Sequence, residues 1–148
     1  MSDPSRVPGR GLVCWALGLV ALHTGVVTLH AAAHLAIPVL VASPLDGALI
    51  LGAFYAGPAL GALCLYAGRG PAPTILAGSF LVGLAYGVTS HFAVSGPDNI
   101  ASVASGGWSP VFMITSAALS ALEGLGLALA LALWRAPARP HGAAAPAA

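Results

Sequence analysis

The sequence has no lysine and few charged residues of any kind. Its 148 residues include five arginines and four acidic side chains, so charged residues make up 6% of the chain, while 58% are hydrophobic. An ordinary soluble domain has about 25% charged residues, because a water-soluble fold must cover its surface with polar side chains. The composition therefore excludes a soluble globular domain. Because there is no basic cluster to hold phosphates, it also excludes nucleic acid as a partner.

Cysteine is scarce as well, and the familiar motifs of soluble enzymes are missing. Cys14 and Cys64 are far apart in hydrophobic segments and form no CxxC motif, so neither a disulfide framework nor a zinc finger is predicted. The sequence contains no GxSxG, P-loop or HExxH motif and no GxGxxG in a strand–helix context. Whether the protein is an enzyme stays open at this stage.

Long uncharged stretches dominate what is present. Four of them, almost free of charged residues, cover 12–41, 47–68, 71–97 and 99–134. Each can supply the roughly 20 apolar residues that a helix needs to cross a bilayer, where every backbone polar group must be paired internally. The sequence therefore predicts an all-α membrane protein, a four-transmembrane-helix bundle. The predicted helices cover about 12–37, 48–66, 74–94 and 110–134.

Flanking segments complete the predicted organisation. Residues 1–11 would be a cytoplasmic N-terminal segment, 12–134 the transmembrane domain, and 135–148 a disordered cytoplasmic tail rich in Ala and Pro. Pro58 is expected to kink the second helix.

The arginines predict the orientation of these helices. In a four-helix arrangement all of them fall on one side, whereas the other side has Asp46 and Asp98 and no basic residue. Positively charged residues collect on the cytoplasmic side, so both termini are predicted to be cytoplasmic (N-in/C-in) in a multi-pass protein of the cell membrane. The arginines are Arg6, Arg10, Arg69, Arg135 and Arg139. The lipid bilayer is the one predicted partner, and a partner subunit or a homo-oligomer stays open.

Three histidines share one face of the first predicted helix. At 100° per residue, His23, His30 and His34 point in nearly the same direction, and the last two are one turn apart. Two imidazoles at this i, i+4 spacing can bind one metal ion. Counting from the inner end of each helix puts His91 of the third helix at about the same depth as His30.

Small residues precede His91 at intervals of four. Ser79, Gly83 and Gly87 form a stripe that His91 continues, and small side chains let helices approach closely in lipid. The stripe is interpreted as packing within one bundle rather than as a dimer contact. Since His91 is then on a packed face, we expect the first and third spans to be neighbours and His30, His34 and His91 to converge.

Other polar residues are candidates to support this site. Glu123 is the only acid within a predicted helix, at the depth of His23, so the two are expected to pair near the middle of the membrane. Asp98 and Asn99 are typical turn residues that could also cover the outer mouth of the site.

The ligand type limits the cofactor. Imidazoles with a nearby carboxylate suit a transition metal ion (Cu, Zn or Fe) rather than Ca²⁺ or Mg²⁺. Haem b is the alternative, because histidines on two helices can ligate its iron, although the outer side has no Arg or Lys for the propionates. The leading hypothesis is an intramembrane histidine-lined site that binds a metal in a redox or transport role. The alternatives are a structural or accessory subunit, whose polar residues only fix helix packing, and a b-type cytochrome module.

Overall fold

The computed structural model describes residues 9–37, 39, 43–68 and 70–136, and all regular structure in these ranges is helical. Four segments are long and apolar enough to cross a membrane, which confirms the coarse prediction of an all-helical fold with four such spans. Most of the predicted cytoplasmic N-terminal segment and nearly all of the predicted disordered tail lie outside the described residues.

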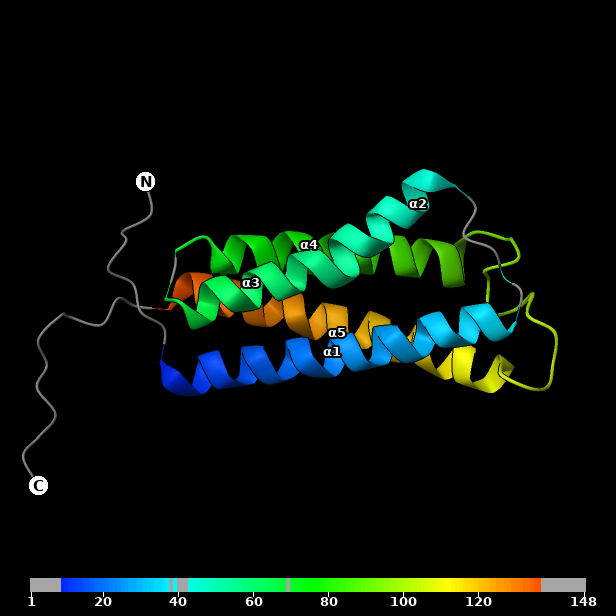
Figure 1. The fold of residues 1–148 in the computed structure, drawn as a ribbon, viewed down its shortest axis with the longest axis horizontal. Coiled ribbons are helices and arrows are strands. Elements are labelled where there is room, and N and C mark those ends of the chain that lie inside the picture. Colours follow the sequence, from blue (N-terminus) through cyan, green and yellow to red (C-terminus); the bar gives the residue numbers. More distant parts are fainter. Residues whose placement is uncertain (1–8, 38, 40–42, 69, 137–148) are drawn as a thin grey trace, which may run out of the picture.

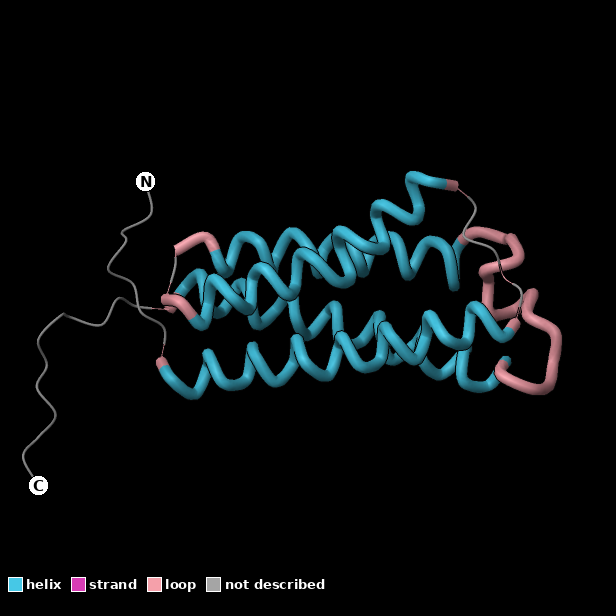
Figure 2. The backbone as a smooth tube through the Cα atoms, viewed as in Figure 1, coloured by secondary structure: helices cyan, strands magenta, loops and turns pink. Residues whose placement is uncertain are grey.

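The four spans run antiparallel along a common long axis (Figures 1 and 2). The first is α1 (Arg10–Ala36) and the last is α5 (Ser109–Arg135). The second is continuous through α2 (Pro44–Leu49), the π-helix η1 (Ile50–Ala56) and α3 (Gly57–Tyr66). The third joins α4 (Ala72–Val88) to the π-helix η2 (Thr89–Ala93).

Local chemistry explains the shape of the second span. The hydroxyl of Ser43 accepts a hydrogen bond from the Asp46 backbone N–H, so the helix begins at Pro44, earlier than the predicted start near residue 48. Pro58 has no N–H to donate, and the wide π-helical turns of η1 precede it directly. The predicted distortion around Pro58 thus takes the form of a π-helix.

The bundle has a definite order around its axis. α5 packs against both α1 and α4, α3 packs against α4, and α3 makes a smaller contact with α1. α1 and α4 are therefore diagonal partners, as Figure 1 shows, and the expectation that the first and third spans are neighbours is wrong. Hydropathy cannot predict this order, because each helix has the same apolar character on most sides.

The two ends of the bundle differ in what they contain. α1 begins and α5 ends at one end, whose interior is an apolar cluster of α1, α3, α4 and α5 side chains. The long connection 94–108 lies at the opposite end, next to the last turns of α1 and η2 (Figure 2). His30, His34 and His91 belong to this second end.

Candidate metal centre

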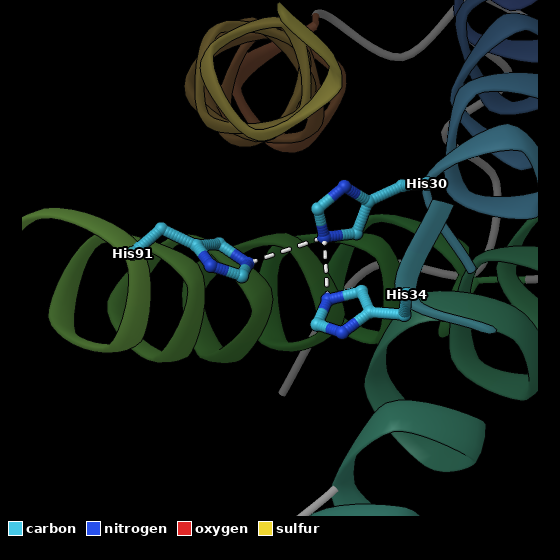
Figure 3. A group of neighbouring side chains, drawn as sticks. All are labelled: His30, His34 and His91. Carbon is cyan, nitrogen blue, oxygen red and sulfur yellow. Dashed lines mark hydrogen bonds between the residues drawn. The ribbon is translucent and has the colours of Figure 1, made fainter. Parts of the chain in front are cut away.

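His30, His34 and His91 converge inside the bundle. The Nε2 atom of His30 lies 3.0 Å from Nε2 of His34 and 3.2 Å from Nε2 of His91 (Figure 3). One nitrogen from each of the three lies within 4.8 Å of the other two. We call this group the histidine cluster. His30 and His91 are buried, and His34 is half-buried at the mouth of the group.

Two local features of the helices position these rings. His30 and His34 stand one turn apart on α1, so their side chains leave the same face of the helix. His91 lies in η2, where the Val94 N–H bonds to the Thr89 carbonyl five residues earlier, which widens the turn. Single π-helical turns of this kind are frequent at functional sites because they re-aim side chains. From opposite sides of the bundle, the rings reach its centre across the diagonal between α1 and α4.

The second nitrogen of each ring faces a hydrogen-bond acceptor. The His30 Nδ1 atom lies 2.8 Å from Thr115 Oγ1, and that hydroxyl donates its own hydrogen to the Val111 carbonyl of the same helix. With its hydrogen used in this way, the hydroxyl oxygen is free to accept from His30 Nδ1. His91 Nδ1 lies 2.9 Å from the carbonyl oxygen of Asp98, which can only accept. His34 Nδ1 has a longer contact of 3.4 Å with the Val39 carbonyl.

These contacts favour rings that carry their hydrogen on Nδ1, since the carbonyl facing His91 can only accept and the Thr115 hydroxyl facing His30 can accept. In these tautomers the neutral rings of His30 and His91 present Nε2 lone pairs to each other at 3.2 Å. Two lone pairs at that distance repel unless a cation lies between them. Metal-ligating histidines usually donate their other N–H to a carbonyl or similar acceptor, as both of these do.

Phe112 supports the cluster from α5. Its ring is fully buried, stacks on His30 at a centroid distance of 5.1 Å, and presents edge contacts to His34 and His91. The aromatic ring restricts rotation of all three imidazoles and closes one side of the cluster with apolar surface.

Asp98 and Asn99 have different positions. The Asp98 Oδ1 atom is 3.4 Å from His34 Nε2 and 3.5 Å from His91 Nδ1, and it has no hydrogen-bond partner among the described residues. The Asn99 side chain instead donates to the Val94 carbonyl and accepts from the Ala101 N–H. Asp98 thus lies against the cluster, whereas Asn99 shapes the loop that holds Asp98 there.

His23 and Glu123 form a separate buried pair. His23 Nε2 and Glu123 Oε1 are 3.6 Å apart, and each side chain is only 1% exposed. Phe54 stacks on the His23 ring and Phe80 meets it edge-on. The structure places the two residues together in the interior, as expected from their equal depth, but apart from the histidine cluster.

A cavity of about 490 Å³ adjoins the cluster. It lies where α2 and η1 diverge from α1, and its walls come from these elements, α4, η2, the 94–108 loop and one residue of α5. His30, His34, His91 and Asp98 form one wall. A molecule in this cavity would directly face the three imidazoles.

Sequence reasoning missed Thr115 and Phe112. A usable signal existed for Thr115, because it and His30 each lie twenty residues from the ends of their helices at Arg135 and Arg10. The same depth count that related His30 to His91 would have related His30 to Thr115. Phe112 carried no such signal, since aromatic residues are common in apolar helices.

Comparisons with protein-family models, with curated proteins and with solved structures find no match to this chain. The function is therefore inferred from the geometry of the chain itself.

Proposed function

We propose that the chain is a multi-pass protein of the cell membrane, with both termini cytoplasmic, that holds one transition metal ion at the histidine cluster. The outward surfaces of the helices support insertion, because large apolar side chains are exposed on every span. Examples are Leu22, Leu51, Leu63, Leu81, Ile114 and Leu125, each more than half exposed. In water such a surface would cause aggregation, whereas in lipid it is the expected exterior.

The observation that carries the metal proposal is the Nε2–Nε2 contact between His30 and His91. When both Nδ1 atoms donate to their acceptors, the two Nε2 lone pairs face each other and fit a shared cation, and a shared proton can join only two of the three rings. A metal ion can accept all three. At metal–nitrogen bonds of about 2.0–2.1 Å, tetrahedral ligands are about 3.3 Å apart, close to the two separations that His30 Nε2 makes with His34 and His91. A purely structural subunit would gain little from such an arrangement.

The donor set and its surroundings favour a resident ion over a transported one, and Cu or Fe at this site would supply redox chemistry. Three neutral imidazoles suit Cu, Zn or Fe, and the cavity beside them leaves an open side for a further ligand. Transport is less well supported, because packed side chains of the apolar cluster, including Leu76, Phe80 and Leu133, fill the bundle towards its other end. Haem b is also disfavoured, since its two axial histidines must lie on opposite faces of a flat ring.

Metal content of the purified, detergent-solubilised protein tests this proposal. We expect about one Cu, Zn or Fe per chain, and its loss in His91→Ala. His23→Ala is the matched control, a buried histidine outside the cluster, and should retain the metal. Helical content and monodispersity of each variant would show that it is folded. Absence of stoichiometric metal in the folded wild-type protein would refute the proposal, and a Soret absorption band would select haem instead.

A further inference from the structure

We propose that the cavity beside the histidine cluster binds a membrane-dissolved molecule of the alcohol or phenol class, with an apolar body and a hydroxyl group directed at Asp98. The inference deepens the proposed function, on which it rests for the metal ion that the hydroxyl oxygen would face.

The walls of the cavity define the apolar body of this ligand. Val27, Ile50, Phe54 and Leu119 line it from three different spans, together with Val94 at the end of η2. A volume of about 490 Å³ lies within the range of sites for small organic molecules and far exceeds the needs of a metal ion. A hydrated cation would require polar walls, so the cavity is better suited to an organic molecule than to an ion path.

The polar side chains around the cavity favour a ligand that donates a hydrogen bond. Its lining includes two carboxylates, Asp46 and Asp98, and no arginine. The Asp46 carboxylate is already paired, since Oδ1 accepts from the Tyr86 hydroxyl and Oδ2 from Ser43.

Asp98 supplies the acceptor that selects the hydroxyl. Its Oδ1 atom is buried and has no hydrogen-bond partner in the described parts of the chain, although it lies 3.4 Å from His34 Nε2. A buried carboxylate oxygen without a donor is costly, and a ligand O–H would satisfy it. The oxygen of the same hydroxyl would then lie beside the histidine cluster. A single hydroxyl group could thus donate to Asp98 Oδ1 and also place its oxygen beside the histidine cluster.

Photolabelling of the full chain in lipid bilayers tests the inference. The probe is a 4-alkylphenol with a diazirine on its alkyl chain, and labelled residues are mapped by mass spectrometry. We expect saturable labelling at the cavity wall around Ile50 and Leu119. Excess 4-butylphenol should compete, whereas 4-butylanisole, which lacks the donor, should need on the order of tenfold higher concentration.

Two variants test the location and the donor requirement. Ile50→Trp fills the cavity and should remove saturable labelling, while Ile114→Trp, a matched change on the exposed face of α5, should not. Asp98→Leu has a similar shape but no acceptor, so it should bring the two competitors to nearly equal effectiveness. Diffuse labelling of exposed residues such as Leu81, or equal competition in the wild type, would overturn the inference.

Labelling is measured in metal-free and in metal-loaded protein, so that the two proposals can fail separately. Saturable, phenol-selective labelling in a protein that binds no metal would refute the metal centre and retain the cavity ligand. Stoichiometric metal without saturable labelling would refute the cavity ligand alone.

Discussion

The carboxyl group of Glu123 lies against the bare backbone of Gly83 in the interior of the bundle. A Cβ atom at position 83 would come within 2.8 Å of Glu123 Oε1, and one at Gly87 would come within 3.6 Å of Oε2. The stripe of small residues on α4 thus provides the space in which Glu123 reaches His23. The missing side chain at Gly83 therefore leaves the space that the Glu123 carboxyl group occupies. A larger residue at this position would keep the carboxyl group of α5 farther away.

Gly83→Ala should therefore displace the Glu123 carboxyl group and destabilise the protein. We expect a loss of about 1–3 kcal/mol, the usual cost of an added methyl group in a packed interior. Unfolding in mixed micelles, followed by circular dichroism, measures this loss. Gly78→Ala on the same helix is the control, since a Cβ there meets nothing within 4 Å, and it should be neutral or slightly stabilising. Equal stability of the two variants would contradict the packing described.

His23 and Glu123 should be energetically coupled. Replacing only one of them by Leu leaves the other buried beside an apolar group, whereas replacing both removes the polar pair altogether. The double variant should be more stable than the sum of the two single effects predicts, by roughly 0.5–3 kcal/mol. Glu123→Gln keeps the shape and a polar contact, so it should cost less than Glu123→Leu. Additive single effects would show that the two side chains do not interact.

Depth within the bundle could be predicted from sequence because an α-helix has a constant rise per residue. His30 and His91 were related by counting from the inner ends of two parallel helices, and His23 and Glu123 by counting from the inner ends of two antiparallel helices. The four spans could also be predicted from sequence, since uncharged apolar runs of this length are typical of helices that cross a bilayer. The convergence of the histidine cluster follows from depth and helical face together.

Lateral arrangement could not be predicted in the same way. The diagonal relation of α1 and α4 depends on side-chain packing around the axis, to which hydropathy is insensitive. The re-aiming of His91 by η2 and the acceptor role of the Asp98 carbonyl involve backbone groups, which residue types do not reveal. The cavity arises from the divergence of α2, a property of the assembled bundle.

Both ends of the chain should be cytoplasmic. A reporter fused after Ala148 should behave as cytoplasmic, and one inserted in the 94–108 connection should behave as external. The reason is the asymmetry of charge, since Arg10 and Arg135 lie at the end opposite Asp98. Exposed aromatic side chains also occur towards both ends of the bundle, as expected at membrane interfaces: Trp15, Tyr66, Trp108 and Trp134. An external signal after Ala148 would invert the proposed topology.

Thr115→Val should weaken metal binding although Thr115 is not itself a ligand. Valine has nearly the same shape but cannot accept the hydrogen bond from His30 Nδ1, so the ring loses the contact that fixes its tautomer and orientation. Loss of such a supporting contact typically lowers metal affinity by about 10- to 100-fold. Competition with a chromophoric chelator measures this change in the purified protein.

The matched control for this substitution is Thr28→Val. Thr28 is exposed on α1 and its hydroxyl donates only to the Thr24 carbonyl of its own helix, so valine there should leave metal affinity unchanged. Thr115→Ser supplies the reverse test, because it retains the hydroxyl and should recover most of the affinity. If Thr115→Val and Thr28→Val bound metal equally well, the His30 tautomer would not depend on Thr115. Thr115 would then not direct the lone pair of His30 Nε2 towards His91, and the tautomer argument for a cation between the two rings would fail.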